Sequence, residues 1–377
     1  MIKRILHSLH LVLGLLSGIV VFIVATTGAL YVFKDDIEAR FCDYKKVAAQ
    51  EQAVILPSEA FEKGEAATPG KTIHGIIYRS PEDALEVVYY QAEPFYYGAA
   101  YLNPYSGEVL KTVDFMKTFF GRVRQGHATL WLPMKTGYTI VALGTIVFVI
   151  MLLTGIVLWW PRKNSSSRSF SFSKAGKPTI KRLEYHKVVG FYVAFFALVI
   201  AITGLSWLLK GLDNAMYKAM GGTKEIAWEA PLSANITPGT PAPENPVDKV
   251  FLHIKQQYPA MPFIEIHALE NDSASVLVEL NRDPSSYNKM DYLFFDQHTL
   301  EPIETPNRFY GKYDQAATAD KIKRSYYDVH TGNILGFPGK ILAFFVSLFC
   351  ASLPITGFIL WWNRRKEKRA FLHKMNI

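Results

Sequence analysis

Four of the ten histidines occur in two pairs whose sequence surroundings match. His10 and His186 each stand four residues before a glycine and 18 residues before the glycine of a Thr–Gly pair. His127 and His330 stand 28 and 27 residues before the glycine of a Thr–Gly pair that is followed by Trp–Trp. The four Thr–Gly pairs are Thr27–Gly28, Thr154–Gly155, Thr203–Gly204 and Thr356–Gly357. This doubled pattern makes the four histidines the leading candidates for chemistry.

Two imidazoles supplied by facing helices can ligate a six-coordinate b-type haem, one on each side of the flat macrocycle. We therefore expect His10 with His186 to hold one haem b, and His127 with His330 to hold a second. The sequence has no Cys-x-x-Cys-His, so covalent haem attachment is excluded. His7, three residues before His10, is an alternative ligand. An interfacial or helix-capping role is the alternative for each single histidine.

Long apolar blocks without charged residues accompany these histidines. They span 11–33, 138–160, 188–209 and 341–362, and each has the roughly 20 residues needed to cross a hydrocarbon core of about 30 Å. The first block has 23 residues, more than the roughly 7 to 15 of a cleavable signal sequence, so we expect it to be retained. Half of the chain is hydrophobic and a fifth is charged, which indicates membrane spans joined to polar domains.

The matching patterns indicate a duplicated two-helix unit. The first and third blocks share one pattern, and the second and fourth blocks share the other. Because equivalent blocks cross in the same direction, the halves should be related by a pseudo-two-fold axis along the membrane normal. Each histidine pair should then face itself across that axis. We expect the Thr–Gly pairs, and Gly14 with Gly18, to serve close helix packing.

Lysines and arginines near the block ends predict the orientation, because such residues are enriched on the cytoplasmic side. They cluster before the first block (Lys3, Arg4), between the second and third (Arg162, Lys163, Arg168, Lys174, Lys177, Lys181, Arg182, Lys187) and after the fourth (Arg364, Arg365, Lys366, Lys368, Arg369, Lys374). We therefore expect a protein of the cytoplasmic membrane with both termini inside. The net charge of +8 reflects this topology and does not indicate nucleic-acid binding.

The expected fold class is a membrane α-helical protein with four transmembrane helices and two extracytoplasmic α+β domains. The transmembrane segments are 1–33, 138–160, 188–209 and 338–362, the outer domains 34–137 and 210–337, and the cytoplasmic parts 161–187 and 363–377. Alternating residues and turn signals predict strands at 72–78, 85–91, 97–102, 108–112, 264–269, 275–281 and 291–296, and a helix at 246–257. Four further histidines lack metal-ligand spacing and receive no role: His74, His253, His267 and His298.

The sequence resembles the PepSY-associated transmembrane proteins over nearly its whole length. The resemblance is carried by His-x-x-x-Gly before a span ending in Thr–Gly, by a strand–turn–Gly–Glu–Val unit at 101–109, and by returning spans with Thr–Gly and Trp–Trp. It implies PepSY-like outer domains. The better understood members are haem-carrying inner-membrane reductases of ferric siderophores that act in the periplasm, and others are iron-regulated membrane proteins.

The hypothesis from the sequence is a transmembrane haem-b electron conduit that reduces a ferric siderophore or another ferric chelate outside the cytoplasmic membrane. No Gly-x-Gly-x-x-Gly fingerprint occurs in the short cytoplasmic segments, so a separate cytoplasmic or membrane electron donor is expected. The alternatives are a permease for the iron complex and a haem-free regulatory module. The absence of charged residues from all four blocks argues against the permease.

Overall fold

The computed structural model describes residues 2–375 except 161–171, 173–177, 225–229, 234–242, 306 and 308. The chain forms two compact units. The helical unit comprises Met1–Phe33, Arg122–Asp213 and Val329–Ile377, and the sheet unit comprises Lys34–Gly121 and Asn214–Asp328. Most of the basic connection expected at 161–187 lies outside the described residues.

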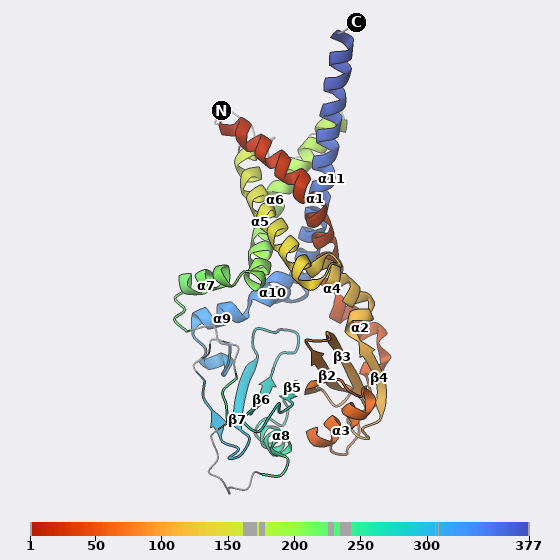
Figure 1. The fold of residues 1–377 in the computed structure, drawn as a ribbon, viewed down its shortest axis with the longest axis vertical. Helices are drawn as coiled ribbons and strands as arrows, with labels where there is room; N and C mark the ends of the chain where they lie inside the picture. The colour runs from red at the N-terminus through yellow and green to blue at the C-terminus, as the bar shows by residue number, and fades with distance from the viewer. Residues whose placement is uncertain are drawn as a thin grey trace. The chain divides into compact units, whose positions relative to one another are not determined.

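Four long helices make up most of the helical unit (Figure 1). They are α1 (Ile2–Tyr31), α5 (Met134–Trp159), α6 (Pro178–Leu208) and α11 (Gly336–Met375). Each contains an 18-residue stretch with mean hydropathy of 2.1 to 2.8, so each is long and apolar enough to cross a membrane. The four expected helices are confirmed. All four begin before their apolar blocks, and α11 also ends beyond its block, because flanking residues such as Lys, Arg, Glu and Leu also favour helix.

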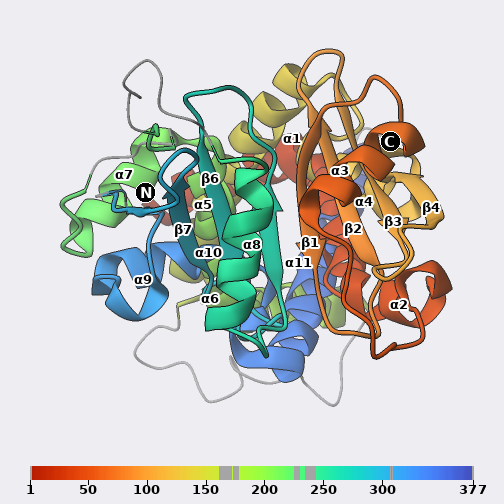
Figure 2. The same cartoon turned by 90° about the horizontal axis from the view of Figure 1, so that it is seen from below.

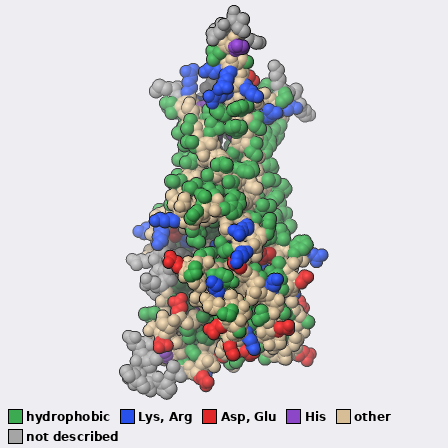
Figure 3. Space-filling model, turned by 45° about the vertical axis from the view of Figure 1, so that its right-hand side comes forward, with side chains coloured by type: hydrophobic (Ala, Val, Ile, Leu, Met, Phe, Trp, Pro, Cys, Tyr) green, Lys and Arg blue, Asp and Glu red, His purple; other side chains and the backbone are tan. Residues whose placement is uncertain are grey.

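The helices are arranged as a four-helix bundle. Helix α1 packs against α5 and α11, and α6 packs against the same two helices. The order around the bundle is therefore α1, α5, α6, α11, and helices with matching sequence patterns lie diagonally opposite each other. On the face that Figure 3 shows, hydrophobic side chains cover the surface of these helices. Leu16, Ile19 and Phe195 are about 70% exposed, which suits contact with lipid rather than water.

Two short helices precede the second and fourth long helices. Helix α4 (Phe119–Thr129) leads into α5, and α10 (Tyr326–Thr331) leads into α11. The connection after α4 places Leu130 and Trp131 at positive φ, whereas the one after α10 places Gly332 there. The two connections are therefore built differently, although each has four residues between its helices.

The sheet unit contains one continuous eight-stranded antiparallel sheet in the order β4-β3-β2-β1-β5-β6-β7-β8. Its strands are β1 (Ile73–Tyr78), β2 (Leu85–Gln91), β3 (Tyr96–Leu102), β4 (Val109–Asp114), β5 (Ile264–His267), β6 (Ser275–Leu280), β7 (Asp291–Asp296) and β8 (Pro302–Ile303). The predicted strands are confirmed. The sequence predicts two outer domains, but pairing of β1 with β5 joins the two segments into one sheet and one compact unit.

Helices α3 (Pro57–Ala67) and α8 (Pro246–Gln257) cover the same face of this sheet (Figure 2). Alternation along the strands explains the packing: Ile264 and Ile266 of β5 are fully buried beneath these helices, whereas Glu265 and His267 point to the opposite face. The predicted helix at 246–257 is confirmed as α8. Among the described residues, the remaining α-helices are α2 (Lys34–Phe41), α7 (Lys210–Ala219) and α9 (Thr318–Arg324), and the 3-10 turns are Asp43–Lys45, Phe115–Lys117, Tyr313–Gln315 and Asn333–Leu335.

A buried carboxylate links α9 to α7 and to the chain that follows α7. Asp320 is fully buried, accepts a hydrogen bond from the Tyr217 hydroxyl, and forms an ion pair with Lys224 at 2.7 Å. Burial raises the pKa of Asp320, but these two partners outweigh burial and hold the pKa below its usual value.

Candidate functional site

The structure places His10 beside His186. Their ring centroids lie 6.4 Å apart, with an angle of 86° between the ring planes. Nδ1 of His10 lies 3.0 Å from Oγ1 of Thr154, and Nδ1 of His186 lies 2.9 Å from Oγ1 of Thr356. Each imidazole is thus held by a threonine on the other long helix of its own half.

The second pair is built in the same way. The ring centroids of His127 and His330 lie 6.1 Å apart, with an interplanar angle of 69°. Nδ1 of His127 lies 2.9 Å from the carbonyl oxygen of Val24 in α1, and Nδ1 of His330 lies 2.9 Å from that of Ile200 in α6. The same Nδ1 of His330 also lies 3.3 Å from Oγ1 of Thr203.

These hydrogen bonds assign one tautomer to all four histidines. A carbonyl oxygen only accepts, so Nδ1 of His127 and His330 must carry the proton. The hydroxyls of Thr154 and Thr356 donate to carbonyls in their own helices, so they accept from Nδ1 of His10 and His186. Every Nε2 is therefore left with a lone pair, the state that ligates a metal while Nδ1–H fixes the ring.

Glycines leave the space in which these rings lie. A Cβ atom built on any glycine of the four Thr–Gly pairs would fall against an imidazole, at or below the limit of normal contact. Its distance to the imidazole Cε1 would be 3.0 Å at Gly28 (His127), 3.3 Å at Gly155 (His10), 2.9 Å at Gly204 (His330) and 3.4 Å at Gly357 (His186). From the sequence we expect only helix packing from these pairs, but in the structure their glycines also lie against the histidine rings.

The spacing of each pair suits a shared metal ion. A metal–imidazole bond is about 2 Å long and the ring centre lies about 1 Å further away, so imidazoles on opposite sides of one ion have centroids about 6 Å apart. The observed separations of 6.4 and 6.1 Å agree with this value. Both pairs therefore have the separation expected of two imidazoles that bind one metal ion.

A cavity of about 360 Å³ surrounds the His10–His186 pair. All four long helices contribute to its wall, which includes the glycines Gly14, Gly18, Gly155, Gly190 and Gly357. Without side chains at these positions, the cavity can accept a flat group beside the two rings. Arg364 also lines the cavity, where its positive charge would attract an anionic substituent of such a flat group.

His7 occupies a different place from the one an alternative ligand would need. It lines the same cavity, but its Nε2 lies 3.2 Å from Nη1 of Arg364 at an exposed position. His10, and not His7, is in ring contact with His186. The geometry therefore favours His10 as the partner of His186.

The two pairs lie at different levels of the bundle. His10 is on α1 itself, and His127 contacts α1 at Val24 and Gly28. With a rise of about 1.5 Å per residue, the levels are about 21 to 27 Å apart along the helix. Apolar side chains pack between them, among them Val193, Ala197 and Val346.

Fold and site together define a multi-pass membrane protein with two stacked histidine pairs in a four-helix bundle. The profile of the PepSY-associated TM region matches residues 7–364, and the chain belongs to this family. No curated protein shows significant sequence similarity to it.

Proposed function

We propose that the protein conducts electrons across the cytoplasmic membrane through two haem b groups and reduces a ferric siderophore or another ferric chelate on the outer side. The His10–His186 pair would hold one haem and the His127–His330 pair the other. The observation that carries the proposal is the repeated geometry: two imidazole pairs with centroids about 6 Å apart and each Nδ1 hydrogen-bonded within the bundle.

The four histidines would hold the two haem groups, and a haem held by two imidazoles would supply one-electron transfer without an open ligand position. The residues of this chain prepare that chemistry. The rings are held by Thr154, Thr356 and two helix carbonyls, so each Nε2 is available to a metal. The glycines of the four Thr–Gly pairs leave room for the rings. The apolar side chains between the levels keep water out of the bundle.

The direction of transfer rests on the expected topology. The basic segments beside the long helices would face the cytoplasm, which puts the His10–His186 pair near a separate electron donor. The His127–His330 pair would then lie near the outer surface. Each electron delivered there converts one Fe³⁺ of the chelate to Fe²⁺.

The two rival functions make different use of the bundle. A permease needs a path with polar or charged groups at mid-membrane, and the four apolar blocks contain no Lys, Arg, Asp or Glu. The function of a haem-free regulatory module does not require four histidines that all share one tautomer. Both observations favour the conduit.

The test is transfer across a sealed vesicle. Purified protein is reconstituted into liposomes that enclose dithionite, a ferric siderophore is added outside, and external Fe²⁺ is measured with a ferrous-specific chelator. Wild type and a His253→Ala control should produce external Fe²⁺, whereas His10→Ala and His127→Ala should not. Uptake of intact ferric complex without external Fe²⁺ would instead support the permease.

A further inference from the structure

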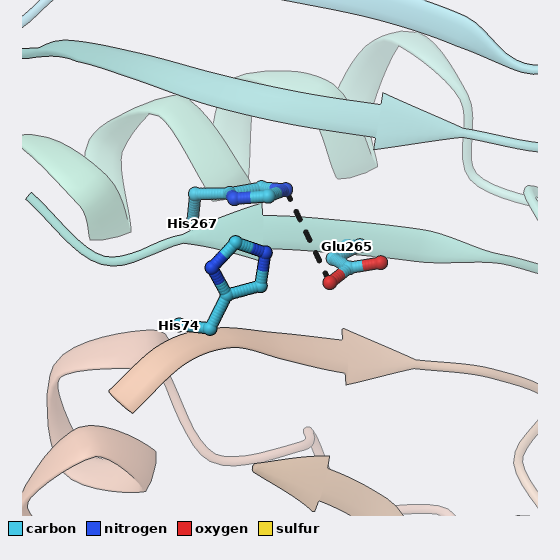
Figure 4. A group of neighbouring side chains, drawn as sticks. All are labelled: His74, Glu265 and His267. Atoms are coloured by element: carbon cyan, nitrogen blue, oxygen red, sulfur yellow. Dashed lines mark ion pairs between the residues drawn. The ribbon is translucent and has the colours of Figure 1, made fainter. Parts of the chain in front are cut away.

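A group of histidine and glutamate side chains gathers on the sheet face opposite α3 and α8. We call it the His–Glu cluster: His74 of β1, Glu265 and His267 of β5, and Glu279 of β6. Figure 4 shows three of these side chains, His74, Glu265 and His267, pointing toward one another from neighbouring strands. The cluster lies within the sheet unit and takes no part in the proposed electron transfer.

The sheet brings these residues together by its register. His267 pairs with Gly75 across the β1–β5 ladder, and Glu265 pairs with Glu279 across the β5–β6 ladder. The register of β1 against β2 shifts between Ile73 and Gly75, so His74 lies at an irregularity. A Cβ at Gly75 would come within 2.9 Å of a β5 carbonyl oxygen and 3.5 Å of Glu265 Oε1, and glycine leaves that space free.

The contacts are close enough for shared ligation. Nε2 of His267 lies 3.2 Å from Oε1 of Glu279 and 4.0 Å from Oε1 of Glu265. The rings of His74 and His267 have centroids 4.6 Å apart, and ligand atoms of His74, Glu265 and His267 all lie within 4.8 Å of one another. Two ligand atoms that each lie about 2.1 Å from one ion are at most about 4.2 Å apart. Rotation of the exposed His74 side chain can bring the three ligand atoms within that distance.

The electrostatics of the cluster favour a cation. Glu265 and Glu279 lie directly opposite each other on β5 and β6, and like charges in this position repel. Only 14% and 17% of the Glu265 and Glu279 side chains are exposed, so water screens their mutual repulsion poorly. A divalent cation between the carboxylates and imidazoles would offset the repulsion between the two carboxylates.

We propose that the His–Glu cluster binds a divalent first-row transition-metal ion, with His74, His267 and Glu265 as ligands and Glu279 supplying further negative charge. Two imidazoles and a carboxylate are a donor set for zinc and for non-haem iron, whereas magnesium and calcium prefer oxygen ligands alone. The competing explanation is a metal-free ion-pair cluster in which a protonated His267 bridges the two glutamates. In that case the cluster has no affinity for zinc.

Zinc is the suitable probe, because it neither absorbs light nor exchanges electrons with haem. The full-length protein in detergent is titrated with zinc chloride by calorimetry, and bound zinc is measured after desalting. Wild type and His253→Ala should bind one zinc ion at this site. His253 is a matched control because it is an exposed histidine of α8 in the same unit.

His74→Ala and His267→Ala should weaken zinc binding by roughly tenfold or more, since loss of even an outer-shell partner weakens metal sites by 10- to 100-fold. Because His74 is exposed, His74→Ala should leave folding intact, and circular dichroism checks this point. Glu265→Gln, which keeps the shape of the side chain, should weaken binding in the same way. Wild-type protein without bound zinc, or a His74→Ala variant that binds zinc as wild type does, would overturn the proposal.

Discussion

Replacing Gly204 by alanine should displace His330 and release the haem that we assign to the His127–His330 pair. The new Cβ would lie 2.9 Å from His330 Cε1 and 3.4 Å from Nδ1. Carbon atoms in contact prefer about 3.5 to 4.0 Å, so the ring must move by about 0.6 to 1.1 Å. That movement opposes the 2.9 Å hydrogen bond from Nδ1 to the Ile200 carbonyl oxygen.

The cost of such overpacking is about 1 to 3 kcal/mol. At 1.4 kcal/mol per factor of ten, affinity for this haem should fall by roughly 5- to 150-fold. Gly211→Ala is the matched control, because a Cβ there meets nothing within 4 Å. Both changes replace a helical glycine and gain up to about 1 kcal/mol of helix propensity, so a difference between them reports the contact with His330.

The assay is haem content per protein after purification and washing, read with the visible spectrum. Gly204→Ala should approach one haem per chain while Gly211→Ala keeps two. If Gly204→Ala retained both haems with an unchanged spectrum, Gly204 would not set the position of the His330 ring. The assignment of a haem to the His127–His330 pair would then fail.

Three further predictions test other parts of the molecule. His127→Ala and His330→Ala should remove the same haem and leave the other, as measured by haem content; removal of different haems by the two variants would show that the repeat does not pair the ligands. A topology reporter after the C-terminus should report cytoplasm, and one near Ser233 the outside, whereas the reverse result would invert the direction of transfer. Asp320→Asn should lower the free energy of unfolding by about 1 to 3 kcal/mol at pH 7. Because the folded-state pKa of Asp320 is depressed, its contribution exists above the unfolded pKa and is lost as pH falls through the folded pKa, so the two proteins should converge in acid; a difference that persists in acid would exclude a role for its charge.

The sequence predicts the helical unit well, because its signals are local or repeated. Block length and the absence of charge identify four helices, and the matching intervals after His10 and His186 predict which helices are equivalent. The structure brings those two histidines together, and likewise His127 and His330. Their role as haem ligands stays a prediction.

The structural features that the sequence does not predict depend on contacts between distant segments of the chain. Each histidine is held by a Thr–Gly pair or a carbonyl of another helix, and helix tilt and level decide which one. The single sheet depends on pairing of β1 with β5, which are separated by a whole pair of transmembrane segments. The His–Glu cluster follows from the same pairing, so the spacing of His74 and His267 along the chain gives no signal of it.

The most direct test of the central claim is the optical spectrum and haem content of the full-length protein, purified in mild detergent from haem-sufficient cells. Paired imidazoles leave no open position on the iron, so the account predicts two haems b per chain with a low-spin six-coordinate spectrum. A well-folded protein without haem, or a high-spin spectrum with an open ligand position, would contradict it.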